Sequence, residues 1–267
     1  MRGISNWVGA VTVLFSVALT ALPAYAERIE CNEVPYVPYT IGTPGVWCLK
    51  HDLSTSMTSG CAIAINVNNV TLDLNDFKVG GLAAGLGTDA RGVCALCRKN
   101  VTVRNGTVRG FLAGVQLLGG FFGGGNDCAQ AYLVENIRAE SNTYAGIWVG
   151  GMGGVIRNNL VVSTGGTTLY PSSINKGIYV DMWSSNVVVL NNDVINTFNT
   201  PYPVAAEAIH AYASDNCMVI NNRVSGAHIG IRFQNSTGLY RGNTVGNIDP
   251  NGGSAYSDGT NAGDNYP

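Results

Sequence analysis

A short block with paired asparagines recurs along the chain and constrains the fold more than any other feature. Its clearest copies are Ile156–Val161, Val189–Val194 and Val219–Val224, each with two asparagines among aliphatic residues. The equivalent position in successive copies is Asn75, Asn105, Asn136, Asn158, Asn191, Asn221 and Gly242, with spacings of 30, 31, 22, 33, 30 and 21 residues. Such variable spacings indicate a coil whose loops differ in length, because helical repeats keep a stricter period.

A second element lies between the asparagine blocks and consists of a small residue, an aliphatic residue and then alternation. Its copies are Gly92–Val93, Gly114–Leu117, Gly146–Val149, Gly177–Val180, Ala208–Ala211 and Gly230–Phe233. Alternation of period two predicts a β-strand in each copy. One strand before the asparagines, one after them and this third strand would stack on neighbouring turns as three parallel sheets. We therefore predict an all-β, parallel β-helix of about seven rungs.

The asparagines themselves are expected to be structural. A tight bend between strands leaves backbone polar groups inside the coil, and an asparagine amide both donates and accepts hydrogen bonds. Asparagine also tolerates the left-handed backbone that such a bend often requires. Stacked asparagines are thus expected to bond to the bends of the rungs above and below them.

Composition agrees with many short strands and excludes two classes of protein. The chain has 35 glycines and only 12% charged residues, which does not suit a helical protein because glycine is a poor helix former. The formal net charge of −2 argues against a general nucleic-acid binder, which needs a clustered basic face. No metal or cofactor is predicted, because the CxxC pair of Cys94 and Cys97 lacks a second pair of ligands.

Residues 1–26 have the features of a secretory signal peptide. Arg2 gives a positive start, Val8–Leu22 is apolar and Ala24–Ala26 offers a small-x-small cleavage site. No later stretch is long and apolar enough to span a membrane, so we expect a secreted or periplasmic protein. The rest of the chain is divided into an N-terminal cap, residues 27–60, the β-helix, residues 61–245, and a C-terminal cap or flexible tail, residues 246–267.

All seven cysteines follow the predicted signal peptide, and export would permit disulfides. Cys97 and Cys128 each lie eight residues before the asparagine of their rung, Asn105 and Asn136. Equivalent Cα atoms on adjacent parallel rungs are about 4.8 Å apart, which is within disulfide range. We therefore predict a disulfide between Cys97 and Cys128.

The other cysteines are constrained less. Cys217 aligns with a buried strand position and is expected to be a free thiol in the core. Among Cys31, Cys48 and Cys61 one pair is expected, but the sequence does not choose it. The odd number of cysteines leaves at least one thiol without a partner in the chain.

Through these blocks the chain resembles the right-handed parallel β-helix proteins of the pectate-lyase-like superfamily, in particular exported bacterial ones. The repeated Asn-Asn and Gly-Ile blocks carry the resemblance, which covers about Val70 to Val245. The resemblance implies a right-handed coil, with a substrate groove over the sheet of Gly-Ile strands and the loops beside it. It bears on the fold more than on the reaction, because one fold supports many chemistries.

Strict alternation in the Gly-Ile strands predicts which side chains face this groove. Ile147, Ile178, Ile209 and Ile231 are expected to point inward, so their successors point outward. The outward columns would then contain Cys94, Gln116, Trp148, Tyr179, His210 and Arg232, and, two residues later, Leu96, Leu118, Gly150, Asp181, Tyr212 and Gln234. Rungs about 4.8 Å apart bring neighbours in a column into contact. The pattern predicts one solvent-facing groove of aromatic, polar and charged groups.

Two loops flank the predicted groove and could wall a cleft. They are Ser163–Lys176 and Asn196–Glu207, and they carry Tyr170, Lys176, Tyr202 and Glu207. Two simpler explanations of the outward face remain open. Aromatic residues on an open sheet often pair across strands for stability alone, and Arg232 with Asp181 could form a surface ion pair that contributes little.

The reaction patterns of the superfamily are not matched. Polygalacturonases carry Gly-His-Gly, Arg-Ile-Lys and paired aspartates, whereas here Ile209 precedes His210 and Phe233 follows Arg232. Inverting hydrolysis needs two carboxyl groups about 6.5–9.5 Å apart, and the face offers only Asp181 and, at a loop end, Glu207. Calcium-dependent lyases need several acidic ligands, and one aspartate on the face is too few.

The remaining chemistry is metal-free β-elimination or epimerisation on a uronic acid. This chemistry needs a base, an acid and a group that stabilises the carboxylate. We assign His210 or Tyr212 as the base, Tyr179 as the acid and Asp181 as the group that orients His210. Substrate binding is assigned to Trp148, Arg232, Gln234 and Gln116.

The expected partner is an acidic polysaccharide or another glycan, and no oligomeric state is predicted. Two other classes remain as alternatives. One is a non-catalytic glycan-binding protein of the cell surface or periplasm, which would use the same aromatic residues. The other is a purely structural β-helix.

Overall fold

Each rung of the computed structural model turns at the first asparagine of the repeated block. The backbone is left-handed there, with φ of 50–55° at Asn75, Asn105, Asn136, Asn158, Asn191 and Asn221, and of 63° at Gly242. The expected bend between two strands is thus confirmed at every copy of the block. The structure describes residues 30–119, 128–199 and 206–267, and the predicted signal peptide lies outside them.

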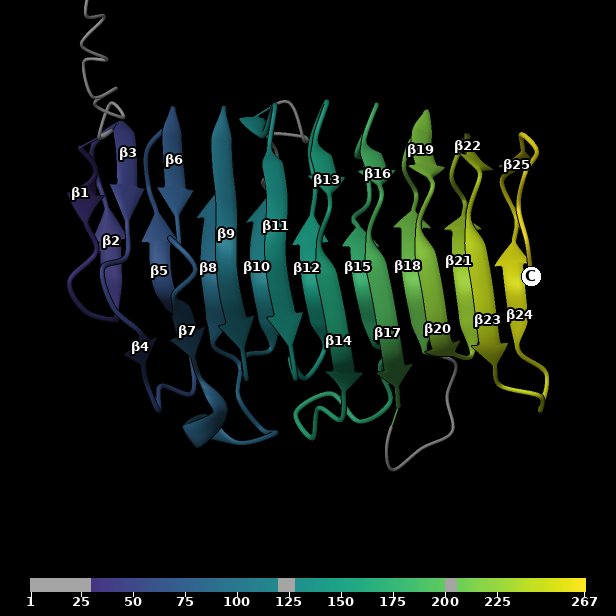
Figure 1. The fold of residues 1–267 in the computed structure, drawn as a ribbon, viewed down its shortest axis with the longest axis horizontal. Helices are drawn as coiled ribbons and strands as arrows, with labels where there is room; N and C mark the ends of the chain where they lie inside the picture. The colour runs from purple at the N-terminus through teal and green to yellow at the C-terminus, as the bar shows by residue number, and fades with distance from the viewer. Residues whose placement is uncertain (1–29, 120–127, 200–205) are drawn as a thin grey trace, which may run out of the picture. The chain divides into compact units, whose positions relative to one another are not determined.

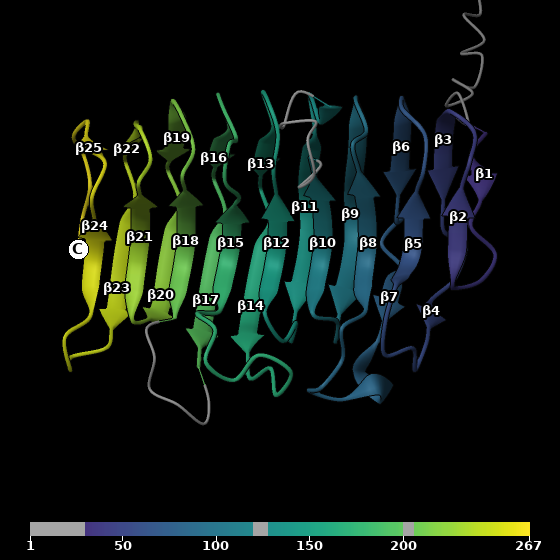
Figure 2. The ribbon, with the colours of Figure 1, turned by 180° about the vertical axis from the view of Figure 1, so that it is seen from behind.

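The strands form three faces that follow one another along the coil (Figures 1 and 2). Face 1 lies before the asparagine bend and contains β1 (Asn32–Glu33), β3 (Gly45–Cys48), β6 (Val70–Asp73), β9 (Val101–Arg109), β11 (Leu133–Glu140), β13 (Val155–Arg157), β16 (Val188–Leu190), β19 (Cys217–Ile220), β22 (Gly238–Arg241) and β25 (Thr260–Asn261). Face 2 lies after the bend and contains β4 (Leu53–Ser54), β7 (Lys78–Gly80), the second halves of β9 and β11, β14 (Leu160–Gly165), β17 (Asp193–Phe198), β20 (Arg223–Ala227) and β23 (Thr244–Ile248).

Face 3 is made by the Gly-Ile strands and their equivalents. It contains β2 (Tyr39–Ile41), β5 (Cys61–Ile65), β8 (Arg91–Leu96), β10 (Ala113–Leu118), β12 (Ala145–Val149), β15 (Lys176–Val180), β18 (Glu207–Tyr212), β21 (Ile229–Gln234) and β24 (Ser254–Ser257). One short 3₁₀ helix, η1 (Leu82–Ala84), follows β7. Neighbouring strands pair in parallel on all three faces, for example Ile147 with Ile178 and Ile178 with Ile209.

The structure differs from the sequence-based expectation in two details. Faces 1 and 2 form one 16-stranded sheet, because β9 and β11 run through the bend without a break. Face 3 has nine strands rather than about seven. The additional rungs come from β2 and β3 at the N-terminal end and from β24 and β25 at the C-terminal end, where only caps were expected.

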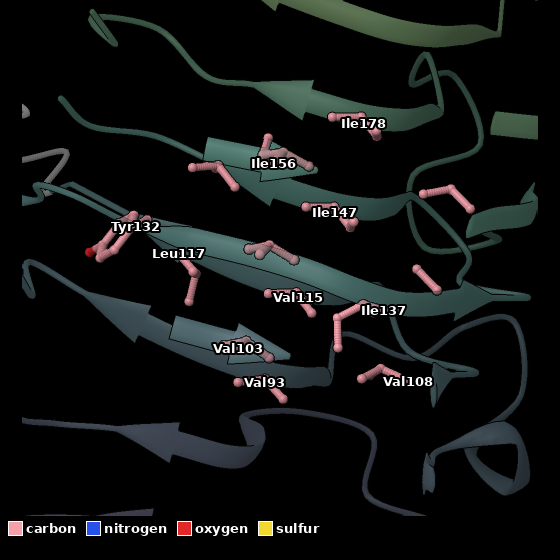
Figure 3. Packing of buried hydrophobic residues seen from close by; sticks show 14 of the residues in the cluster. Val93, Val103, Val108, Val115, Leu117, Tyr132, Ile137, Ile147, Ile156 and Ile178 are labelled. Carbon is pink, nitrogen blue, oxygen red and sulfur yellow. The ribbon is translucent and has the colours of Figure 1, made fainter. Parts of the chain in front are cut away.

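The interior of the coil is filled by aliphatic side chains from every rung. Ile147, Ile178, Ile209 and Ile231 are each no more than 1% exposed, which confirms that these residues point inward. Figure 3 shows Val115, Ile147 and Ile178 one above another in this core. The described residues contain no helix that is long and apolar enough to cross a membrane.

The second asparagine of each block forms a buried ladder. The Asn159 side-chain amide donates to Oδ1 of Asn192 at 2.9 Å, Asn192 donates to Asn222 at 2.9 Å, and Asn222 donates to Asn243 at 3.0 Å. The same oxygens accept backbone N–H groups, as in the 2.9 Å bond from Asn192 to Asn222. Because each amide satisfies the bend of the preceding rung, as Asn192 does with the backbone N–H of Asn159 and the carbonyl of Ile156, the structural role predicted for these residues is confirmed.

Disulfides link successive parts of the N-terminal rungs. The expected pair, Cys97 and Cys128, is bonded, with its Cα atoms 4.7 Å apart. Cys31 is bonded to Cys48, and Cys61 to Cys94, a pair that the sequence did not suggest. Cys217 is a buried free thiol, as expected.

Candidate functional site

A change in the inside–outside alternation shapes the outer side of face 3. A Cβ atom at Gly177 would lie 2.4 Å from Cγ1 of Val194, so this glycine faces the interior together with the following Ile178. The cross-strand pairing skips the same position, since Lys176 pairs with Glu207 and Ile178 with Ile209. Two successive residues thus point inward, and the residue before them points outward. Lys176 and Glu207 therefore lie on the same side as the aromatic column.

Aromatic rings stack along this outer side from rung to rung. The ring centroids of Trp148 and Tyr179 are 5.4 Å apart, and those of Tyr179 and His210 are 5.5 Å apart. Tyr144 lies 5.6 Å from Trp148, and Tyr212 lies 5.8 Å from His210. Register explains the stack, because Trp148, Tyr179 and His210 are Cα partners on β12, β15 and β18 (Figure 2).

At one end of this stack, the fully buried carboxylate of Glu207 contacts the side chains of Arg232 and His210. Glu207 is 0% exposed. Its Oε1 accepts a 2.6 Å hydrogen bond from Nη1 of Arg232, and its Oε2 lies 2.6 Å from Nδ1 of His210. Burial alone would raise the pKa of Glu207, but His210 and Arg232 together bring it below its usual value. Glu207 is thus ionised at neutral pH.

Lys176 lies beside this carboxylate under two tyrosine rings. Its Nζ donates to the Tyr144 hydroxyl at 3.0 Å and to the Ile174 carbonyl at 2.8 Å, and lies 4.8 Å from the centroid of Tyr179. Burial lowers the pKa of Lys176 to about 8, although Glu207 and Asp181 oppose that shift. Burial raises the pKa of Tyr144 to about 12, so its phenol stays protonated.

Asp181 lies at the opposite end of β15 from Lys176. Burial raises the pKa of this carboxyl group, while the backbone N–H of Met182, which donates at 2.8 Å, and the side chains of Tyr179 and Trp148 limit the rise. The pKa of Tyr179 is raised well above its ordinary value by burial and by the nearby Asp181. The two carboxyl groups of the site are therefore pushed in opposite directions, Asp181 up and Glu207 down.

These residues form one group on the outer side of face 3, and several of its buried polar atoms have no hydrogen-bond partner among the described residues. We call the following residues the face 3 cluster: Tyr144, Trp148, Lys176, Tyr179, Asp181, Glu207, His210, Tyr212 and Arg232. Nε2 of His210 and Nε of Arg232 have no hydrogen-bond partner among the described residues. Leaving a buried donor or acceptor unpaired costs about 1–3 kcal/mol. Such atoms occur where water or a ligand completes the hydrogen bonding.

The predicted open groove is corrected by the burial of its central residues. Tyr179 is 7%, Asp181 4% and His210 3% exposed, because their rings and carboxylate pack against neighbouring rungs instead of facing solvent. Trp148, Tyr212, Arg232, Gln234 and Gln116 are half-buried. The sequence-predicted residues thus come together, with an enclosed centre and a partly accessible rim.

One predicted partnership and one alternative left open by the sequence are also corrected. The group that lies against Nδ1 of His210 is Glu207, three residues away on the same strand, rather than Asp181 on the rung below. Arg232 pairs with Glu207 rather than with Asp181, and part of its guanidinium is already engaged by this bond. Both corrections follow from the inward Ala208, the equivalent of Gly177 on β18, because it places Glu207 on the outer side of the sheet.

Four residues of the site were absent from the sequence-based assignment. Lys176 and Glu207 were placed on loops, and only the register with Ile178 and Ile209 reveals their direction. Tyr144 precedes its strand by one residue. Trp183 follows β15 in a left-handed conformation, φ 60°, and is 60% exposed beside the end of β18. An exposed tryptophan directly after a strand that bears charged groups was the signal available for it.

Within the described residues, the two flanking loops contribute fewer side chains to the site than expected. Tyr170 is exposed, and Lys176 and Glu207 belong to strands rather than to loops. Tyr202 lies outside the described residues. No group of three or more His, Cys, Asp or Glu residues in the described ranges is arranged to hold a metal ion.

Comparison with known proteins identifies the fold. A family model described as "Right handed beta helix region" matches residues 91–265. No curated protein matches the chain. Among solved structures, the Dettilon tailspike protein is similar over 87% of this chain and 57% of its own, with 14% identity and a TM-score of 0.48. The protein of Geobacillus virus E2 ORF18 is similar over 86% and 50%, with 10% identity and a TM-score of 0.44.

A third solved structure is the catalytic domain of a GH87 alpha-1,3-glucanase in complex with nigerose. It is similar over 87% of this chain and 62% of its own, with 11% identity and a TM-score of 0.28. The chain thus spans between half and two thirds of the length of these structures. These similarities concern the fold.

Proposed function

We propose that this chain, which belongs to the right-handed β-helix family, is an exported protein that binds an acidic polysaccharide at the face 3 cluster. The observation that carries the proposal is the stack of Trp148, Tyr179 and His210 over buried charges and unpaired polar atoms. Aromatic rings beside polar groups suit a sugar, which has apolar faces and hydroxyl edges.

A structural role explains the cluster less well. Burying charged groups costs several kcal/mol per ion, and a well-packed apolar cluster of similar volume is often equally stable or more stable. The equivalent positions on other rungs of face 3 show that apolar residues fit here, since Ala113 and Ile229 pair with Ala145 and Glu207. Lys176 and Glu207 are adjacent charged members of this column and lie on the rungs of Tyr179 and His210, whereas Arg91 is a charged member outside the stack.

The charge balance supports an acidic ligand. Lys176, with a pKa of about 8, is mostly protonated at neutral pH, Glu207 is ionised because its pKa is lowered, and the guanidinium of Arg232 adds a permanent positive charge. Asp181 has a raised pKa and so contributes less negative charge. Part of the Arg232 guanidinium remains unpaired, with Nε lacking a partner among the described residues. A uronic acid carboxylate would accept from such a planar group more readily than from a lysine.

Export is part of the proposal because of the cysteines. Three disulfides lie within the described residues, and disulfides persist in oxidising compartments. The features of residues 1–26 point the same way, since they are those of a secretory signal peptide. Detection of the mature N-terminus near Glu27 in periplasmic or culture fractions tests this part.

Catalysis is the finer proposal for the same site. Glu207 lies against Nδ1 of His210 and leaves Nε2 unpaired, an arrangement that suits a base. His210 would remove the proton beside the substrate carboxylate. Tyr179, held protonated by its raised pKa, would donate a proton to the departing oxygen as the new double bond forms. In an epimerase the proton would instead return to the other face of the same carbon.

Non-catalytic binding is the second candidate, and a specific observation favours it. His210 and Tyr179 are almost fully enclosed, whereas Trp148, Tyr212, Gln234 and the exposed Trp183 are accessible at the rim. A glycan bound at this rim would contact the rings without reaching Nε2 of His210. Binding therefore needs fewer assumptions than turnover.

Calorimetry with a panel of acidic and neutral polysaccharides tests the binding proposal. We expect binding to acidic members, and a loss of about tenfold in affinity for Trp148→Ala, because the stacking of a ligand ring on an aromatic side chain is worth about 1–3 kcal/mol in the case of nucleic acid bases. Tyr36→Ala is a matched control, because Tyr36 is an exposed aromatic residue far from the cluster in sequence. Unchanged binding after Trp148, Tyr179 and Arg232 are all replaced by Ala, in a folded protein, would refute the site.

Turnover is tested with the same panel. Absorbance of an unsaturated product reports a lyase, and proton exchange at the sugar carbon reports an epimerase. If either occurs, His210→Ala should lower the rate about 10²-fold or more. If neither occurs with polysaccharides that bind, the protein is a binder and the catalytic proposal is wrong.

A further inference from the structure

A hollow of about 340 Å³ lies where face 2 ends, on β17, β20 and β23. Strand pairing makes Ser163, Asn196, Gly226 and Asn247 equivalent on four successive rungs. All four have left-handed backbone, with φ of 54°, 58°, 74° and 52°. Gly226 is the member of this column that has no side chain, and it lines the hollow together with its two asparagine neighbours.

The polar column is interrupted at this glycine. On one side, the Asn196 side-chain amide donates to Oγ of Ser163 at 3.3 Å. On the other side, the amide of Asn247 makes no hydrogen bond to a described residue. The three atoms nearest to a Cβ atom at Gly226 would be Cα and N of Asn196, both at 3.4 Å, and Nδ2 of Asn247 at 3.9 Å. The backbones of the two asparagines are two rungs apart, about 9.6 Å, so neither amide reaches the other.

The hollow is lined by amides, an aromatic ring, an imidazole and one carboxylate, that of Asp249. Phe198 forms an apolar wall, and Nδ1 of His228 lies 3.2 Å from Oδ2 of Asp249. That contact leaves Nε2 of His228 available to a ligand. The described residues that line the hollow include no lysine or arginine. Amides, an imidazole and an aromatic wall without a cation suit hydroxyl groups rather than an anion.

We propose that this hollow binds a neutral sugar or polyol, whose hydroxyl groups bridge the amides of Asn196 and Asn247 where Gly226 leaves the column open. A volume of about 340 Å³ falls at the lower end of the range for small-molecule pockets, which fits one or two sugar rings. The proposal does not rest on the function of the face 3 cluster, because the two sites share no residue.

Histidine ring resonances give a direct readout, since the chain has three histidines. The folded protein is titrated with glucose, galactose, mannose and glycerol up to about 10 mM, which would fill most of a site with a Kd of about 1 mM. At least one of the four should shift the ring signals of His228 in a saturable way and leave those of His51 unchanged. If none of the four shifts His228, the proposal is wrong.

Gly226→Asn is the decisive variant because it completes the column. Asparagine tolerates the left-handed backbone, as Asn196 and Asn247 show at the same position. Its side chain fills the hollow, so affinity should fall by at least about tenfold. Gly153→Asn is the control, because Gly153 also has a positive φ, 65°, and an added Cβ there would meet no atom within 4 Å. The control should bind as the unchanged protein does.

A second variant keeps the test decisive if Gly226→Asn fails to fold. Asn247→Ala removes one of the two bridging amides without filling the hollow, and this exposed side chain has no bond to lose. We expect its affinity for the sugar to fall about tenfold. Equal affinity in the unchanged protein and in either folded variant would overturn the proposal.

Discussion

One carboxylate oxygen of Glu207 lies 2.6 Å from Nδ1 of His210, and the other accepts a 2.6 Å hydrogen bond from Arg232. A single enclosed side chain therefore fixes both the imidazole and the guanidinium. Glu207 is a positioning residue, since it is 0% exposed and cannot itself touch a ligand. Its removal should affect stability first and the site second.

Glu207→Gln should lower the free energy of unfolding by about 2 kcal/mol or more, because it leaves the half-buried Arg232 without its counter-charge. Urea unfolding at neutral pH measures this loss. Glu135→Gln is the control, because Glu135 pairs with Arg157 at 2.7 Å near the surface, where a pair contributes less than about 1 kcal/mol. Equal losses in the two variants would contradict the prediction.

The sign of the pH dependence follows from the lowered pKa of Glu207. A carboxyl group with a lowered folded-state pKa stabilises the protein fully above its unfolded pKa of about 4.3. That contribution disappears as the pH falls through the folded-state pKa. The difference in unfolding free energy between the unchanged protein and Glu207→Gln should therefore shrink on acidification below about pH 4.

The two asparagines of one block should respond differently to substitution. The left-handed backbone at Asn191, φ 53°, explains why asparagine is found there, and Gly242 shows that glycine also occurs at this position. Asn191→Gly should therefore cost less than about 1 kcal/mol. Asn192→Ala should cost about 2–4 kcal/mol, because the amide bonds to Asn222 and to the Ile156 carbonyl and accepts from Asn159.

Chemical unfolding of both variants measures the contrast. Asn158→Gly and Asn159→Ala repeat it one rung earlier, where the same bonds are present. The two roles assigned to the pair would be wrong if the first substitution were as costly as the second.

The fold was predictable because its signals are local. Asn191 and its equivalents mark each bend by their backbone preference, and the inward isoleucines mark each strand. The site was predictable only in part, because strict alternation was assumed across Gly177. The inward direction of that glycine depends on the close approach of Val194 from another strand, which no local pattern encodes. The equivalent inward position on β18 is Ala208, and because it was not recognised, Glu207 was left on a loop and the enclosure of His210 was missed.

The close approach of Val194 to Gly177 gives a fourth prediction. Gly177→Ala should destabilise the protein by about 1–3 kcal/mol, because its Cβ would lie 2.4 Å from Cγ1 of Val194. Val194→Ala removes that methyl group and should relieve part of the strain. A double-mutant cycle by urea unfolding should show a favourable coupling of at least about 0.5 kcal/mol. Additive losses would mean that the glycine is required for another reason, such as the nearby carbonyl of Ala208.

Lys176 gives the last prediction, because burial lowers its pKa from 10.5 to about 8. Between these values the unfolded chain holds a proton that the folded protein has released. Unfolding then takes up a proton, so the free energy of unfolding rises with pH in this window. At 1.36 kcal/mol per pKa unit, the rise attributable to Lys176 is about 2–3 kcal/mol between pH 8 and pH 10.

Lys176→Met isolates this contribution, because methionine keeps much of the side-chain volume and does not titrate. Unfolding of both proteins is measured at several pH values between 8 and 10. This range stays below the raised pKa of Tyr144, about 12, whose titration has the opposite sign. The unchanged protein should gain stability relative to Lys176→Met as the pH rises. Parallel pH profiles would show that Lys176 keeps its proton, and the site would then carry its full positive charge throughout this range.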